Sequence, residues 1–360
     1  MESVKENHCR DLADKLERTK DLTNEEFISV LESEDPELNE YLAEKARPAR
    51  ERYYGKEVYL RGLIEFTNYC KNNCRYCGIR SGNRNAERYR LTEEQILDCS
   101  DQGYTLGFRT FVLQGGEDPY FTDERMESIV RNIKERHPDC AITLSIGERE
   151  KDSYQRLFDA GADRYLLRHE TADKEHYEML HPKEMSYEHR MKCLRDLREI
   201  GYQVGCGMMV GSPYQTTEHL VKDLRFLQEF RPEMVGIGPF IPHHDTEYAE
   251  RKEGSLDLTL RLLSVIRLFL PDVLLPATTA LGTVNALGRE KGLQAGANVV
   301  MPNLSPTNVR GKYLLYDNKI CTGDEAAECI RCMTARIARV GYQVEEKRGD
   351  HIFFSAAKRH

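Results

Sequence analysis

The stretch Phe66-Thr-Asn-Tyr-Cys70-Lys-Asn-Asn-Cys74-Arg-Tyr76-Cys77-Gly-Ile-Arg80 decides how the rest of the chain is interpreted. Its three cysteines have C-x3-C-x2-C spacing and directly follow a β-like run at residues 58–66. Three thiolates this close together can hold three irons of one cubane cluster, since thiolate sulfur is the usual ligand of iron–sulfur centres. The loop has no fourth cysteine, so the fourth iron would keep an open position.

A disulfide, a zinc site and chance clustering each fit this loop less well than a cluster does. A disulfide with one spare thiol disagrees with the odd total of 11 cysteines and with the lack of a secretory signal. A zinc site commonly takes four protein ligands from paired C-x2-C units, and only one such unit lies here. Chance clustering of buried cysteines does not suit a loop in which polar residues 71–73 and 75 separate the thiols.

The length and composition of the chain limit which folds and which partners are expected. A chain of 360 residues, 40% of them hydrophobic, can bury one barrel-sized core or two ordinary ones. The formal charge of −8 is spread without a basic block, so no nucleic acid is expected as a partner. No apolar run approaches a membrane span, so no membrane partner is expected either. We expect a cytoplasmic protein in which Cys9, Cys99, Cys140, Cys193 and Cys206 stay reduced as packing residues.

The chain is expected to have three parts. Residues 1–50 follow helical periodicity, with Thr23 and Glu26 spaced as a capping box, and are predicted to form a helical extension. Residues 51–305 are predicted to form the main domain. Residues 306–360 form a C-terminal segment in which Cys321, Cys329 and Cys332 have C-x7-C-x2-C spacing. This triplet indicates a second cluster, 2Fe–2S or 4Fe–4S, with zinc completed by a histidine and redox-inert surface thiols as alternatives.

The main domain alternates short apolar runs with amphipathic ones. Strands are predicted at 58–66, 110–113, 141–145, 164–167, 203–209, 234–237, 273–276 and 298–301. Helices are predicted at 92–103, 123–135, 153–160, 187–200, 217–230, 256–269 and 288–295. Alternating elements imply parallel strands, and eight strands over this length favour a closed (β/α)8 TIM-type barrel. The alternation itself is also compatible with an open sheet or a partial barrel.

Candidate ligand-binding residues follow the carboxyl ends of the expected strands, the edge where such folds place their chemistry. The second strand ends in Gln114-Gly115-Gly116-Glu117, where the glycines let a ligand approach the backbone and Glu117 can accept from an ammonium group. The fourth ends in Arg168 and Glu170, charges that are costly to bury unless they pair or bind a ligand. A plain turn and a structural ion pair are the respective alternatives.

These motifs together resemble the radical S-adenosylmethionine (SAM) enzymes, in which a C-x3-C-x2-C loop follows the first strand and a Gly-Gly-Glu motif ends the second. The resemblance covers about Glu57 to Cys332 and is closest to the HydE-type maturases of FeFe-hydrogenase. Its most specific marks are the sequences at 164–171, 234–243 and 276–282. One departure is Gly115, where the family often has serine, so no side-chain hydroxyl contact is expected from this position.

The resemblance implies a role for each part of the site. Cys70, Cys74 and Cys77 would hold a 4Fe–4S cluster whose open iron binds SAM, and an electron from the cluster would cleave SAM into methionine and a 5′-deoxyadenosyl radical. The residues implied to surround SAM are Tyr76, Gln114, Gly116, Glu117, Ser145, Arg168, Glu170, Arg190 and Met209, with Arg190 on the SAM carboxylate. Those implied to line a cavity for an anionic, cysteine-bound iron carbonyl-cyanide precursor are Arg61, Thr143, Thr278, Thr279, Met301, Tyr313 and Tyr316.

The implied function is assembly of the hydrogenase diiron subcluster, with ferredoxin or flavodoxin as reductant and other hydrogenase maturases as partners. Methylornithine synthase and biotin synthase are related alternatives that share the loop. A non-enzymatic iron–sulfur carrier or scaffold would leave Glu117 and Arg190 without a role. Conversion of SAM into 5′-deoxyadenosine by the reduced protein separates the enzymes from the carrier.

Overall fold

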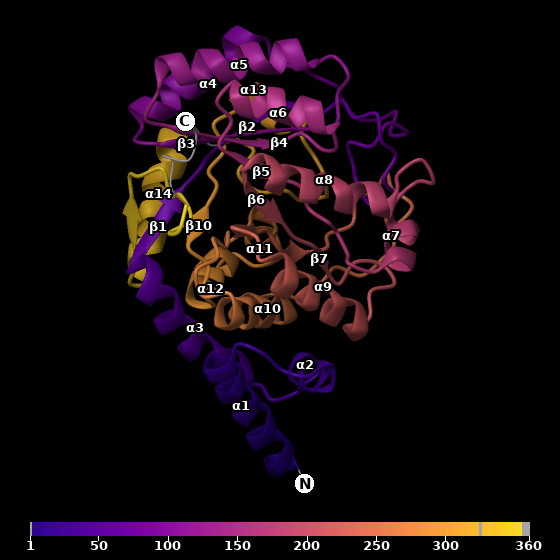
Figure 1. Cartoon of the computed structure of the whole chain (residues 1–360), viewed down its shortest axis with the longest axis vertical. Coiled ribbons are helices and arrows are strands. Elements are labelled where there is room, and N and C mark those ends of the chain that lie inside the picture. The colour runs from indigo at the N-terminus through magenta and orange to yellow at the C-terminus, as the bar shows by residue number, and fades with distance from the viewer. Residues whose placement is uncertain (1, 324–325, 355–360) are drawn as a thin grey trace.

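The computed structural model describes residues 2–323 and 326–354 (Figure 1). It begins with helices α1 (Glu2–Thr19), α2 (Asn24–Leu31) and α3 (Leu38–Tyr54). The predicted capping box is confirmed, because Thr23 Oγ1 accepts from the Glu26 N–H and Glu26 Oε2 accepts from the Thr23 N–H. α1 and α3 pack on α10 (Leu256–Phe269), and Figure 1 shows α1 and α2 lying beyond that helix. The predicted division of the chain near residues 50 and 305 stays a prediction.

A parallel sheet of six strands lies at the centre. In spatial order the strands are β2 (Gly62–Thr67), β3 (Thr110–Gly115), β4 (Ala141–Ser145), β5 (Arg164–Leu166), β6 (Gln203–Cys206) and β8 (Met234–Val235). The helices between them are α4 (Glu93–Thr105), α5 (Asp123–Arg136), α6 (Lys151–Asp159), α7 (Lys174–Leu180), α8 (Tyr187–Ile200) and α9 (Thr217–Phe230). The predicted alternation is therefore confirmed. The strands read as continuous apolar runs because both of their faces are buried, as at Phe111-Val112-Leu113.

The predicted closed barrel is confirmed only as a parallel α/β fold, because the described residues contain no closed sheet. A second sheet joins β10 (Val299–Val300), β1 (Glu57–Leu60) and β11 (Gln343–Glu345), and β7 (Met209–Val210) pairs with β9 (Gly238–Pro239). The strand predicted at 273–276 is wrong, since Leu274 and Pro276 make only single bridges, to Met234 and Val299. Pro276 has no backbone N–H to donate, so a ladder is interrupted there.

The C-terminal segment covers the amino ends of the strands. β11, which the sequence pattern did not predict, pairs with β1 in parallel register. Beyond it, Asp350 Oδ1 lies 2.6 Å from Nη2 of Arg164, a fully buried side chain at the start of β5. Arg348 Nη2 lies 3.0 Å from Asp163 Oδ1. These pairs neutralise charge that would otherwise be costly to bury.

Four further helices complete the C-terminal third: α11 (Thr279–Val284), α12 (Gly288–Gln294), α13 (Thr307–Arg310) and α14 (Ala326–Arg339). Figure 1 shows α14 beside β1, and α11 and α12 near α10. Within the described ranges, no helix combines the length and apolar character needed to cross a membrane.

Candidate active site

The cysteine loop connects β2 to α4 and is held by backbone hydrogen bonds at both of its ends. The Lys71 N–H donates to the Glu117 carbonyl over 2.9 Å, and the Gly78 N–H donates to the Leu315 carbonyl over 2.9 Å. Between them, the Arg75 N–H donates to the Leu180 carbonyl over 3.0 Å. The loop is therefore fixed by the strand-end segment after β3, the end of α7 and the segment after α13.

Two glycines allow this close packing. A methyl group at Gly116 would lie 2.2 Å from the Tyr69 carbonyl oxygen and 2.7 Å from Cys70 Cβ. A methyl group at Gly78 would lie 2.2 Å from the His243 ring. Real Cβ atoms do not approach other atoms so closely, so only glycine fits at either position without displacing the loop. The predicted importance of Gly116 thus has a steric basis.

The three thiols of the loop gather close enough to influence one another. Burial, and then the neighbouring Cys77 and Cys70 sulfurs, hold the pKa of Cys74 well above its usual value. Burial and Cys70 raise the pKa of Cys77 to about 12. Thiols in such a setting do not ionise by themselves at neutral pH, whereas a bound metal deprotonates its thiol ligands outright. The donor set therefore suits a metal centre better than a free nucleophile.

Tyr76 and Met209 meet in one apolar group beside the loop. They pack with Leu180, Phe240 and Tyr248. His181 Nδ1 lies 2.9 Å from the Tyr177 carbonyl, which only accepts, so the ring donates there and its Nε2 accepts from the Tyr76 hydroxyl at 3.3 Å. Burial lowers the pKa of His181 to about 3, so the ring is neutral. The Tyr76 hydroxyl is thereby oriented.

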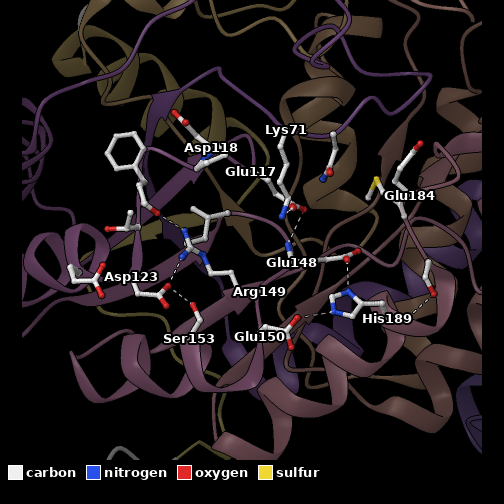
Figure 2. A pocket seen from close by; sticks show the side chains of 18 residues that line it. Lys71, Glu117, Asp118, Asp123, Glu148, Arg149, Glu150, Ser153, Glu184 and His189 are labelled. Carbon is white, nitrogen blue, oxygen red and sulfur yellow. Dashed lines mark hydrogen bonds and ion pairs between the residues drawn. The ribbon is translucent and has the colours of Figure 1, made fainter.

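Glu117 points back toward the cysteine loop (Figure 2). Its Oε2 lies 3.3 Å from Lys71 Nζ, and its Oε1 accepts from the Glu148 N–H over 2.9 Å. A methyl group at Gly147 would lie 2.0 Å from Glu117 Cγ. Glu117 also lines a cavity of about 900 Å³ that opens beside Lys71, and Figure 2 shows Glu148 and His189 facing each other in it.

Arg190 is buried rather than solvated, with 7% of its surface exposed. Its Nε donates to Glu148 Oε1, and its Nη1 donates to the Arg168 carbonyl over 2.5 Å. Burial disfavours the charged guanidinium, but Tyr177 and Glu148 more than offset this, and the pKa of Arg190 lies well above its usual value. Burial also disfavours the charged form of Glu148 and would raise its pKa, but Arg190 and His189 hold that pKa below its usual value. An ordinary surface role for Arg190 is excluded.

Arg168 and Glu170 form the ion pair considered from the sequence, with Nη2 and Oε2 3.2 Å apart. Their geometry does not make a hydrogen bond, and Arg168 Nε, Arg168 Nη2 and Glu170 Oε2 are buried without a hydrogen-bond partner. Glu170 also adopts a left-handed backbone with φ of 65°, which a non-glycine residue keeps only under external constraint. Its N–H donates to the Gly207 carbonyl over 3.0 Å. The pair has unused hydrogen-bonding capacity.

Gln114 and Ser145 are register partners at the carboxyl ends of β3 and β4. Glu65 of β2 is the partner of Gln114 on its other side. Tyr313 is buried and hydrogen-bonds to the Gln114 side chain, while burial raises its pKa well above the usual value. Gln114 therefore lies beside both Ser145, which like Gln114 is predicted to contact SAM, and Tyr313, which is predicted to line the substrate cavity.

The remaining predicted cavity residues form two groups. Arg61 and Met301 adjoin one apolar cluster, because Arg61 Nη1 donates to Met234 Sδ over 2.9 Å and Met301 packs against the cluster that contains Met234. Thr279 instead begins α11, and Tyr316 lies beside the same helix, where it hydrogen-bonds to Thr283. No described contact joins the two groups.

Several of these buried polar groups have no protein partner. Nε and Nη2 of Arg61, Oγ1 of Thr143 and Oγ1 of Thr278 are all buried without one. Thr278 occupies the N-cap of α11, yet its hydroxyl does not cap that helix. Buried polar groups normally find partners, so this set suits a bound polar ligand.

The C-terminal cysteines lie apart from the loop. Cys321 follows the segment after α13, and Arg289 Nη1 and Nη2 each lie 3.7 Å from its Sγ. Cys332 is exposed on α14. Cys329 belongs to α14, and its side chain lies outside the described residues. The predicted second centre is therefore tested only through Cys321 and Cys332.

Sequence reasoning missed four residues that support the site: Glu148, His181, Met185 and Arg289. Glu148 orders Arg190, His181 orients Tyr76, and Met185 Sδ lies 3.6 Å from Cys74 Sγ. Only Glu148 had a signal, an acidic residue three positions after the strand end at Ser145. The other contacts join segments that are distant in sequence, so no local sequence pattern predicts them.

Known proteins match this chain over most of its length. The family model of the radical SAM superfamily matches residues 64–227. The FeFe-hydrogenase maturase subunit HydE of Thermotoga maritima is 46% identical over 92% of this chain and 94% of its own length. A 3-methylornithine synthase of Methanosarcina acetivorans is 30% identical over 89% of this chain and 90% of its own. The crystal structure of methylornithine synthase (PylB) matches with a TM-score of 0.81 at 29% identity, covering 93% of this chain and 97% of that one.

A parallel α/β fold with a three-thiol loop at its strand ends defines a radical SAM enzyme, and the chain belongs to that superfamily. Within it, the chain belongs to the family of the maturase subunit HydE. Enzymes of this class use a 4Fe–4S cluster and SAM. The gathered thiols, the glycine at 116 and the unpartnered polar groups fit these cofactors.

Proposed function

We propose that this protein matures FeFe-hydrogenase, acting on a small anionic precursor of the diiron subcluster. The observation that carries the proposal is Arg61, which is buried without an ion-pair partner among the described residues and with two nitrogens unpartnered. Burial holds the pKa of Arg61 well below its usual value, a cost that a bound anion would offset. The 46% identity to a hydrogenase maturase supports the same assignment.

In this proposal, Cys70, Cys74 and Cys77 hold the 4Fe–4S cluster. When bound, the cluster and SAM supply one-electron cleavage of SAM to methionine and a 5′-deoxyadenosyl radical. Glu117 accepts from the SAM ammonium, and Arg190, kept in place by Glu148, donates to the carboxylate. Tyr76 and Met209 give the adenosyl group an apolar surface. The surrounding buried residues exclude water from the reacting atoms.

The proposed substrate cavity is lined by the two groups of predicted residues. Arg61 and Met301 take one end, and Thr278, Thr279 and Tyr316 take the other. A ring of strands closed through the single bridges at Leu274 and Pro276 would enclose them. Guanidinium and hydroxyl donors suit an anion with several acceptor atoms.

The proposal includes a second cluster on Cys321, Cys329 and Cys332, a ferredoxin or flavodoxin as reductant, and a cytoplasmic location. Methylornithine synthase is the second candidate, favoured by the TM-score of 0.81 to that enzyme. An amino-acid substrate would need an ammonium-binding carboxylate as well as a cation such as Arg61, and no carboxylate is among the residues predicted to line the cavity.

The deciding experiment activates FeFe-hydrogenase apoprotein in lysate that contains the other maturases. Reconstituted wild-type protein should restore hydrogen production, and Arg61→Met should reduce it strongly. Incubation with L-lysine should yield 5′-deoxyadenosine without methylornithine. Methylornithine formation, or full hydrogenase activation by the Arg61→Met variant, would overturn the proposed function.

A further inference from the structure

Arg289 connects the C-terminal cysteine segment to the carboxyl-edge helix α11. Its side chain is buried, with 5% of its surface exposed. Nη1 and Nη2 both point at Cys321 Sγ, each 3.7 Å away, and Nη2 also donates to Thr279 Oγ1 over 3.3 Å. One guanidinium therefore contacts a predicted cluster ligand and a residue next to the unpartnered Thr278 hydroxyl.

Glycines make room for this contact. A methyl group at Gly282 of α11 would lie 2.7 Å from Ile320 Cδ1 and 3.4 Å from Arg289 Nε. A methyl group at Gly288 would lie 1.9 Å from the Leu281 carbonyl oxygen. α11, the start of α12 and the residue before Cys321 therefore approach so closely that Arg289 has little freedom to turn away.

A second contact from the neighbouring residue fixes the same geometry. Glu290 Oε1 lies 2.6 Å from Nε of Arg336, which belongs to α14 together with Cys332. Glu290, and at longer range Cys332 and Cys321, raise the pKa of Arg336. α12 thus holds both sides of the C-terminal cysteine segment, through Arg289 on one side and Glu290 on the other.

We propose that Arg289 is a positioning residue that couples the C-terminal cysteine centre to Thr279 at the carboxyl edge of the fold. The inference rests on the proposed cluster at Cys321, Cys329 and Cys332. Thiolates bound to iron carry negative charge, and N–H donors at a ligand sulfur tune the reduction potential of the cluster. Arg289 satisfies that charge with two donors and uses the same planar group to hold the Thr279 hydroxyl.

The first test is the midpoint potential of the C-terminal cluster, followed by electron paramagnetic resonance in the reconstituted holoprotein. Arg289→Gln should shift it to a more negative value, because the positive charge and the donors that favour the reduced cluster are lost. Arg289→Lys keeps the charge and should shift it less. Arg339→Gln, an exposed arginine on α14, is the charge-matched control and should leave it unchanged. An unchanged potential in Arg289→Gln would overturn the proposal.

The second test is hydrogen–deuterium exchange of the 279–284 peptide, which needs no substrate and no C-terminal cluster. Arg289→Gln and Cys321→Ala should each speed exchange about fivefold, the size expected for one lost hydrogen bond in a local opening. Both substitutions break the same series of contacts, from Cys321 through Arg289 to Thr279. The double variant should therefore exchange no faster than either single variant. Additive effects, or no effect of Cys321→Ala, would contradict the coupling.

The two tests separate this inference from the function on which it rests. If the triple replacement of the C-terminal cysteines leaves iron content unchanged, the proposed cluster is wrong, yet the exchange experiment still decides whether Arg289 joins Cys321 to Thr279.

Discussion

The two cysteine triplets of this chain contain the same ligand type in opposite surroundings. Cys70, Cys74 and Cys77 lie on a loop whose backbone is bonded on both sides, under a glycine that admits no methyl group. Of the C-terminal triplet, Cys332 is exposed, and Cys321 is contacted by the side chain of Arg289. The comparison shows that the surroundings of a cysteine triplet, and not its spacing alone, indicate which triplet serves the reaction. The first triplet adjoins strand ends with unpartnered polar groups, and the second adjoins peripheral helices.

Removing one thiol of the first triplet should have the largest effect. Cys74→Ser should abolish formation of 5′-deoxyadenosine from SAM, because a hydroxyl does not replace a thiolate on iron. The fold should persist, since the thiol lies on a loop outside the apolar core, and circular dichroism should match the wild type. Turnover at a normal rate would show that the active cluster lies elsewhere.

The next prediction concerns Arg190, which is proposed to bind the SAM carboxylate. Arg190→Ala should weaken SAM binding by about 2–5 kcal/mol, which corresponds to about thirtyfold or more in Kd. Arg190→Lys should recover part of this, because lysine lacks the fork that reaches two acceptors. Calorimetric titration of SAM into the reconstituted protein measures both. Arg195→Ala, on the exposed face of the same helix, serves as the control, and equal affinity in the two alanine variants would remove Arg190 from the SAM site.

A steric change should separate loop geometry from ligand chemistry. Gly116→Ala inserts a methyl group 2.2 Å from the Tyr69 carbonyl oxygen, so the loop must move at a cost of about 1–3 kcal/mol. We expect a lower fraction of protein with the N-terminal cluster, measured from iron and sulfide content. The matched control is Gly311→Ala, where no atom lies within 4 Å of the added methyl group. Equal cluster content in both variants would contradict the steric argument.

The smallest effect on catalysis is expected from the second triplet. Replacing Cys321, Cys329 and Cys332 together by alanine should lower the iron content. SAM cleavage should stay within about twofold of the wild type, because the contacts of Cys321 through Arg289 lead to Thr279 of the proposed substrate cavity and not to a residue proposed to bind SAM. Iron analysis and 5′-deoxyadenosine assays on the same preparation measure the iron content and the rate of SAM cleavage. Complete loss of cleavage in a folded triple variant would reverse the assignment of the two centres.

Local patterns predicted much of the site because its key signals lie within a few residues. The cysteine spacing, the Gly116–Glu117 pair after β3 and the capping box at Thr23 are properties of short stretches. By contrast, the Arg190–Glu148 pair joins residues 42 positions apart, and the role of Glu148 depends on a loop conformation that no periodicity encodes. Closure of the sheet was overestimated because the apolar run at 273–276 resembles a strand, although Pro276 interrupts its ladder.

The pairing of Arg164 with Asp350 has a consequence for how the protein is made. The two residues are 186 positions apart, so the ribosome needs about 10–40 s between them at the usual 5–20 residues per second. During that interval the fully buried position of Arg164 has no carboxylate from Asp350, and the amino edge of the sheet cannot reach its final charge balance. Nascent chains stalled before residue 350 should therefore expose this edge to proteases and chaperones, and release of the last segment should protect it.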